Sequence, residues 1–175
     1  MHEHNPWRIH ADRCRPRLGS GRTDAGFADF VQMSGCSGKI IIINSYFEGA
    51  HDDPVNIHGT HLKAVGSEAP DRLTVRFMHG QSYGFTPFYK GDEVEIVDRH
   101  TLNCLQQAKV KNSRRIDDYT FELTFDRRLS SLPDGYSVED LAVENVTHTP
   151  EVEISGNYFA RIPTRGILIP PAASR

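Results

Sequence analysis

Three aspartates in the first third of the chain stand where they could carry acid–base chemistry. Asp52 and Asp53 are adjacent in a His-Asp-Asp-Pro sequence, and Asp29 precedes Asp53 by 24 positions. If the chain folds with a period of that length, Asp29 and Asp53 lie one above the other, at the strand spacing of roughly 4.8 Å. Two carboxyl groups that close repel each other, and one then holds its proton more firmly. A pair of acids separated in this way provides the general acid and general base of glycoside hydrolysis.

The segment His51–Pro54 also fits an ordinary turn, in which aspartate side chains bond to local backbone and proline fixes the next φ angle. Two features favour a catalytic site: the stacked Asp29, and a high density of groups that hydrogen-bond sugars. The catalytic candidates are therefore Asp29, Asp52 and Asp53, and the candidates for substrate binding are Gln32, Asn56, His58, Gln81, Tyr83 and Arg165. The turn remains the alternative.

An internal repeat supports this vertical arrangement. A shift of 112 positions matches the segment from Pro150 to the segment from Gly38, and a shift of 24 matches Phe30–Met33 to Pro54–Ile57. The first shift aligns Val152 with Ile40, Ile154 with Ile42, Tyr158-Phe159 with Tyr46-Phe47, and Ile167 and Ile169 with Val55 and Ile57. It also places Arg165 above Asp53, where the guanidinium could pair with the carboxylates or reach a sugar hydroxyl. A solvated arginine at a corner is the alternative.

Short β-branched runs predict an all-β fold. A period near 24 residues, with strands joined by a turn, suits right-handed parallel β-helix coils interrupted by a small antiparallel β-barrel-like insertion. The one helical signal, of a turn or two, lies around Ser137–Val143. Strands are expected at Lys39–Ile43, Val55–His58, Leu73–Met78, Glu93–Val97, Tyr119–Phe125, Val152–Ile154 and Gly166–Ile169. If the repeat is coincidental, one irregular β-sandwich is the alternative.

The chain then divides into four parts. Residues 1–18 show no strand or helix pattern, 19–58 should form β-helix coils, 59–148 the inserted antiparallel module, and 149–175 the coil resumed and truncated. Gln81 and Tyr83 lie in a glycine-bracketed loop of the insertion, which could close over a sugar or feed aromatic side chains into the barrel core. Both ends resemble cuts through a larger structure, so we expect a segment of a longer protein.

Composition narrows the range of partners. A net charge of −3 and a pI near 6.3 give no electrostatic case for nucleic acid or an anionic membrane, which favours a small or neutral ligand. The three cysteines form no disulfide framework and no zinc-type spacing, so neither a metal nor a cofactor is expected. No apolar run reaches the length of a membrane span, and no export signal follows Met1. The oligomeric state stays open.

These residues resemble glycoside hydrolase family 110. The resemblance rests on ADFVQMSGCSGKIIIINSYFEGAHDDPVNIHGTHLKAV from Ala28, on VRFMHGQSYGF and GDEVEIV, and on the closing YFARIPTRGILI. It implies an exo-acting α-galactosidase that releases terminal α-1,3-linked galactose with inversion, and a parallel β-helix with small β-barrel insertions. It further implies acidic candidates at Asp29, Asp52 and Asp53, a glycan with terminal α-galactose as partner, and a secreted or periplasmic location.

Two other functions fit an all-β repeat. A non-catalytic β-helix module could bind glycans or form a stalk, but it has no need for clustered carboxylates. A pectin-lyase-like enzyme would want a calcium site and a basic catalytic residue facing a uronate. The column here offers one arginine and no cluster of lysines, which argues against a lyase.

Overall fold

The computed structural model describes residues 6–11, 13–80, 82–132 and 134–169, and these form an all-β structure. The chain forms two compact units. We call the first, which holds the residues up to His58 and those from Thr149, the ladder unit. We call the second, Gly59–His148, the barrel unit. In the described part of the chain, no helix is long and apolar enough to cross a bilayer.

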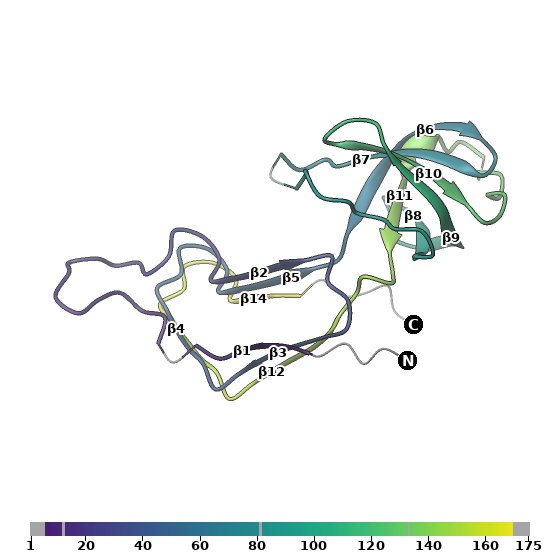
Figure 1. The fold of residues 1–175 in the computed structure, drawn as a ribbon. Coiled ribbons are helices and arrows are strands. Elements are labelled where there is room, and N and C mark those ends of the chain that lie inside the picture. The colour runs from purple at the N-terminus through teal and green to yellow at the C-terminus, as the bar shows by residue number, and fades with distance from the viewer. Residues whose placement is uncertain (1–5, 12, 81, 133, 170–175) are drawn as a thin grey trace. The chain divides into compact units, whose positions relative to one another are not determined.

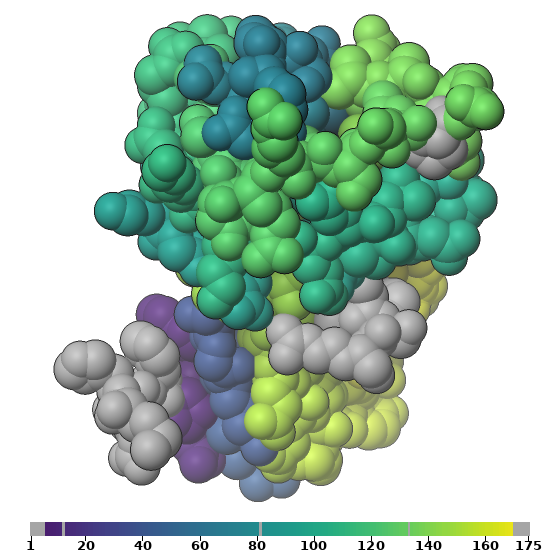
Figure 2. Space-filling view, turned by 90° about the vertical axis from the view of Figure 1, so that its right-hand side faces the viewer, coloured from purple at the N-terminus to yellow at the C-terminus, as the bar shows by residue number. Residues whose placement is uncertain are grey.

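The ladder unit consists of three passes of the chain that run side by side (Figure 1). Each pass pairs with the next through parallel strands, which gives three small parallel sheets in the orders β1-β3-β12, β4-β13 and β2-β5-β14. Figure 2 shows the passes as adjacent bands coloured purple, blue and yellow. Pass one contains β1 (Trp7–Ile9) and β2 (Val31–Ser34), pass two β3 (Lys39–Ile43), β4 (Tyr46–Glu48) and β5 (Val55–His58), and pass three β12 (Glu151–Ser155), β13 (Tyr158–Ala160) and β14 (Ile167–Leu168).

The strand registers follow the two shifts that the sequence repeat predicts. Between β2 and β5 the partners are 24 positions apart, as the contact between Ser34 and His58 illustrates. Between passes two and three they are 112 apart, which Asn157 and Ser45 illustrate. The predicted pairs Val152↔Ile40, Ile154↔Ile42, Tyr158↔Tyr46, Phe159↔Phe47 and Ile167↔Val55 are all present.

The first 18 residues differ from the expectation. We expected no strand there, but Trp7–Ile9 pairs with β3, and Cys14 forms a bridge with Phe47. Partners on these faces are 33 positions apart, as for His10 and Ile43, whereas they are 24 apart between β2 and β5. Additional residues therefore lie between Cys14 and Gly26, in the loop that protrudes from pass one in Figure 1. This loop breaks the period and hides the first strand from a repeat search.

Burial in the ladder unit depends on the position of a pass in the stack. The buried cluster consists of Val31, Ile40, Ile42, Phe47, Val55 and Ile57, and all except Val31 belong to pass two. The ring of Phe47 stacks between Phe30 and Phe159, with centroid distances of 5.8 and 5.3 Å. Within the described residues, passes one and three each pair with one neighbouring pass, and their apolar side chains stay partly exposed.

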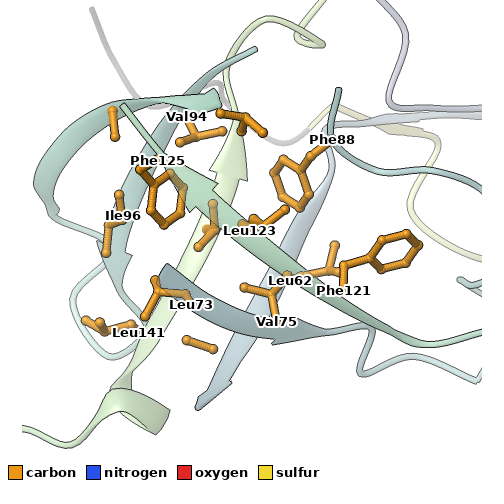
Figure 3. Packing of buried hydrophobic residues seen from close by; sticks show 14 of the residues in the cluster. Leu62, Leu73, Val75, Phe88, Val94, Ile96, Phe121, Leu123, Phe125 and Leu141 are labelled. Atoms are coloured by element: carbon orange, nitrogen blue, oxygen red, sulfur yellow. The ribbon is translucent and has the colours of Figure 1, made fainter. Parts of the chain in front are cut away.

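Six antiparallel strands close the barrel unit, in the order β10-β7-β6-β11-β8-β9. Alternate side chains point inward and form a cluster of buried residues that includes Phe88, Phe121, Phe125, Leu73 and Val94 (Figure 3). The predicted antiparallel, barrel-like insertion is thus confirmed as a closed barrel. The strands are β6 (His61–Ala69), β7 (Arg72–Arg76), β8 (Glu93–Asp98), β9 (Cys104–Arg115), β10 (Thr120–Phe125) and β11 (Leu141–Asn145).

The helical turn or two expected around Ser137–Val143 is present over three residues only. A single 3-10 turn occupies Val138–Asp140, with the Asp140 carboxylate accepting bonds from the Ser137 backbone and hydroxyl. The chain then enters β11, because Leu141 and Val143 join the barrel core at strand spacing.

Candidate functional site

The candidate aspartates lie at the corner that leads into β5 and at the matching corner of pass one. Gly26 bridges to Ala50 before this corner, and Val31 pairs with Val55 after it. The 24-position register therefore holds on both sides of the aspartates. Gly49 begins the corner with a φ of +73°, and a Cβ there would lie 3.0 Å from the Thr23 carbonyl oxygen. Only glycine fits both constraints without displacing the neighbouring pass.

Asp53 is held by residues of pass three. Its Oδ1 accepts hydrogen bonds from the Thr164 hydroxyl at 3.2 Å and from the Arg165 backbone at 3.1 Å. Its Oδ2 lies 2.9 Å from Nη2 of Arg165, although no well-directed hydrogen bond reaches that oxygen. The Asp53 side chain is 1% exposed, whereas that of Arg165 is 66% exposed. Arg165 thus compensates a buried charge while its own head group stays in water.

Asp52 and Asp29 are more accessible than Asp53. Asp52 is exposed, and its Oδ1 accepts a hydrogen bond from the Asp53 backbone at 2.9 Å, which leaves the other oxygen for solvent or ligand. Asp29 is half-buried, and its Oδ2 accepts a bond from Nδ2 of Asn56 at 3.0 Å. The hydrogen bond between Asp29 and the next pass is therefore made to the amide of Asn56.

The remaining candidates of the ladder unit follow β2 and β5. Gln32 is exposed and pairs in register with Asn56. The Oδ1 atom of Asn56 is buried and accepts no hydrogen bond. Nδ1 of His58 lies 3.4 Å from the Ser34 hydroxyl. Asp29, Asn56 and Gln32 are thus brought together on one face, with His58 further along the same strand.

The two candidates of the insertion belong to the barrel unit. Tyr83 lies in the loop after β7, where its ring stacks on Tyr119 with a centroid distance of 4.5 Å. Gln81 lies outside the described residues. Whether either side chain contacts a substrate bound at the aspartates stays a prediction.

Sequence reasoning missed two features of the corner. Thr164 bonds to Asp53, and the 112-position shift that aligned Arg165 with Asp53 also aligns Thr164 with Asp52. The rings of Phe27 and His51 stack at 5.4 Å, and these residues are separated by the same 24 positions as Ser34 and His58. Both could have been found by applying the two shifts to every residue of the corner.

The corner offers carboxylates, an amide and a guanidinium, which can move protons and bind hydroxyl groups. Among the described residues, no group of three histidine, cysteine or acidic side chains is arranged to hold a metal ion. Asp52 presents an accessible carboxylate for proton transfer, and Asp29 and Asn56 present a hydrogen-bonded acid–amide pair. This set suits acid–base chemistry on a neutral, hydroxyl-rich molecule.

Comparison with known proteins also supports acid–base chemistry on a hydroxyl-rich molecule. A family model described as GLAA-B beta-barrel domain II matches residues 72–141, within the barrel unit. Alpha-1,3-galactosidase A of Bacteroides thetaiotaomicron is 55% identical over 163 residues, which cover 92% of this chain and 28% of the relative. Alpha-1,3-galactosidase A of Streptomyces avermitilis is 46% identical over 159 residues, covering 86% of this chain and 25% of the relative. Alpha-1,3-galactosidase B of Phocaeicola vulgatus is 37% identical over 148 residues, which cover 81% of this chain and 25% of the relative.

The chain is therefore related to glycosidases over most of its length. The resemblance to glycoside hydrolase family 110, inferred above from the residues, is confirmed. The chain spans about a quarter of the length of the curated relatives it matches.

Proposed function

We propose that this chain is the part of an α-1,3-galactosidase that carries the acid–base residues, and that the enzyme releases terminal α-linked galactose with inversion. The observation that carries the proposal is the corner of the ladder unit, where aspartates of successive passes meet an amide and a guanidinium. Sequence identity to enzymes named for this activity supports the choice of substrate.

We further propose that the three passes are coils of a right-handed parallel β-helix and that residues 59–148 are an insertion between two of them. The parallel registers and the common shifts support this architecture. The strand Trp7–Ile9 supports an earlier start of the coils than residue 19. The described residues from Thr149 to Ile169 resume the stack, and the rest of the predicted part 149–175 lies outside the described residues.

Two of the three candidates Asp29, Asp52 and Asp53 supply the acid and the base. An inverting glycosidase needs its two carboxyl groups roughly 6.5–9.5 Å apart, so that a water molecule fits between the base and the sugar. Corners of successive passes can provide such a gap when the side chains splay, whereas Asp52 and Asp53 leave the chain in alternate directions. The accessible Asp52 is the best placed of the three to meet a glycosidic oxygen.

The substrate-binding groups follow from the same arrangement. Gln32, Asn56 and His58 provide hydrogen-bond donors and acceptors along β2 and β5, which suit the hydroxyl groups of galactose. Arg165 fixes Asp53 and keeps an exposed guanidinium that could reach a hydroxyl. No group in this set requires a charged substrate, in agreement with a neutral terminal sugar.

The test is a chimera in which this chain replaces its matching segment in the Bacteroides thetaiotaomicron relative. Asp29→Asn and Asp52→Asn in the chimera should each lower kcat on an aryl α-galactoside or an α-1,3-linked disaccharide by about 10²–10⁴-fold, because each removes a proton-transfer group. Asp134→Asn, on an exposed loop of the barrel unit, is the matched control and should leave kcat unchanged.

Proton NMR of the first-formed sugar should show β-galactose, the product of inversion. Full turnover by both aspartate variants would move the chemistry away from this corner. A folded chimera that binds galactosides without hydrolysing them would instead favour the alternative, a non-catalytic glycan-binding module.

A further inference from the structure

A three-layer stack of side chains stands at one end of the barrel unit. The guanidinium of Arg76 lies over the ring of Tyr119, with its carbon 5.2 Å from the centroid, and the ring of Tyr83 stacks on Tyr119 at 4.5 Å and 23°. Tyr119 is the middle layer and is only partly exposed. Tyr83 is 46% exposed, so about half of its surface, which includes part of the side chain outside the stack, can meet a ligand.

Ion pairs and hydrogen bonds fix the lower two layers. Nη1 of Arg76 donates to the Thr120 hydroxyl at 2.8 Å and lies 3.9 Å from an oxygen of Asp117. The other oxygen of Asp117 accepts a bond from the Tyr119 backbone at 2.7 Å. These contacts hold Tyr119 against the barrel before any ligand arrives, which limits the ordering entropy that binding must supply.

The loop that carries Tyr83 is attached at two points. Phe85 packs on the core residue Phe77 with a centroid distance of 5.0 Å, and the Gly84 backbone donates to the Asp118 carbonyl oxygen. Gly84 has a φ of +86°, a conformation that L side chains rarely adopt and that lets both neighbouring rings turn toward the barrel. A Cβ at Gly84 would meet no atom within 4 Å, so a substitution there strains the backbone without a clash.

We propose that the exposed part of Tyr83 is a platform for a neutral pyranose ring, so that the barrel unit carries a carbohydrate subsite of its own. Tyr119 and Arg76 are its positioning residues. The proposal rests on the function proposed above and extends it, because it assigns glycan recognition to the inserted barrel as well as to the aspartates. One face of a pyranose exposes C–H groups that pack on an aromatic ring, while its hydroxyls need polar neighbours.

One such polar neighbour is Asp118, which directly precedes Tyr119 in the chain. Its side chain is 70% exposed, and its carboxylate offers acceptor oxygens for sugar hydroxyls. Arg115 pairs with Asp118 at 2.6 Å and holds that carboxylate in place. An aromatic face bordered by an oriented carboxylate favours a saccharide over an apolar ligand.

A second tyrosine stack in the chain provides the matched comparison. Tyr158, 56% exposed, stacks on Tyr46 at 4.9 Å, but these residues are ladder neighbours on β13 and β4. The exposed part of Tyr158 therefore belongs to the edge of a stack of strands, where a further pass would cover it. Tyr83 lies in a loop outside the barrel strands, and it belongs to none of the strand ladders that the described residues form.

The experiment measures binding of methyl α-galactopyranoside and an α-1,3-linked galactose disaccharide to this 175-residue chain, by saturation-transfer NMR with titration. Tyr83→Ala should raise Kd roughly 3- to 10-fold, the size expected for loss of one aromatic contact. Tyr158→Ala should leave Kd unchanged. Tyr119→Leu should weaken binding and reduce saturation transfer from aromatic protons to the sugar, and Tyr119→Phe should restore both.

Circular dichroism on each variant checks the fold. If Tyr83→Ala does not fold, Tyr83→Trp decides, because a larger ring should tighten binding at least twofold. Equal Kd values for Tyr83→Ala and the unmodified chain, or no binding by the unmodified chain, would overturn the proposal. A failure of this proposal can be told apart from a failure of the proposed function. The first shows in sugar binding by the Tyr83 variants, and the second shows in hydrolysis by the aspartate variants.

Discussion

The two units build their cores from β-strands in opposite ways. The barrel closes on itself, so every strand has two neighbours and contributes buried residues to one interior cluster. The ladder unit is a stack with two ends, and its buried cluster comes almost entirely from pass two. Closure makes burial uniform along a sheet, whereas stacking makes burial depend on how many neighbours a pass has.

The same difference decides where chemistry can lie. Side chains at the corners of a stack repeat at a fixed offset, so residues far apart in sequence such as Asp53 and Arg165 meet without any special loop. The barrel instead presents recognition groups on the loops that connect its strands, as Tyr83 does. The corners of the ladder unit bring charged side chains into register, and the loops of the barrel unit present exposed side chains.

One substitution made in both units gives the largest effects. Phe121→Ala in the barrel and Phe47→Ala in the ladder unit each remove a side chain that is 1% exposed, and each should destabilise its own unit by about 3–5 kcal/mol. Residue-resolved hydrogen exchange under native conditions should show faster opening only in the unit that carries the change. Equal acceleration of both units by either variant would show that the two cores unfold as one.

Asn157→Ala should have an intermediate effect confined to the ladder unit. Its side chain accepts a bond from the Ser45 backbone and donates to the Ile42 carbonyl, both at 2.8 Å, and so ties two passes at their corner. Removing it leaves partly buried backbone groups unpaired, at a cost of about 1–3 kcal/mol in the free energy of unfolding. Denaturant titration measures the cost, and an unchanged midpoint would mean that water replaces the amide.

The smallest expected effect is on the thermal stability of the barrel unit at acid pH. Hydrogen bonds from the Thr101 hydroxyl, the His100 backbone and the Tyr136 hydroxyl lower the pKa of Asp98 from 3.8 to about 2. Because the folded pKa is the lower one, the stabilisation is complete above about pH 4 and is lost as the pH falls toward 2. Asp98→Asn should flatten the fall in barrel melting temperature across that range. An unaltered slope would assign the acid sensitivity to other groups.

Much of the ladder unit could be predicted because similar side chains recur at fixed positions in successive passes. Identical or similar residues recur at the two shifts, so Tyr46-Phe47 predicted the place of Tyr158-Phe159, and Asp53 predicted the place of Arg165. The barrel was predictable from alternation, which is strong in strands with one buried face. The repeat and the alternation are both readable because buried side chains recur at fixed spacings along the sequence.

The rest depended on contacts that no local pattern encodes. Trp7–Ile9 is too short to show a period, and the longer offset of pass one conceals its match to β3. The helical signal around Ser137–Val143 corresponds to one 3-10 turn, because Leu141 and Val143 pair as part of strand β11 and tertiary pairing prevailed there over local propensity. The partners of Asp29 and Asp53 also follow from side-chain directions that a register alone does not give.

Asp53→Asn in the chimera, with folding and hydrolysis measured on the same preparation, tests most directly whether the ladder corner is catalytic. Asparagine can still accept the bonds from Thr164 and the Arg165 backbone, and the guanidinium that loses its ion pair is already in water. The protein should therefore stay folded while kcat falls by about 10²–10⁴-fold. Near-normal hydrolysis, or loss of the fold, would contradict the account and leave Asp53 as a structural residue of the corner.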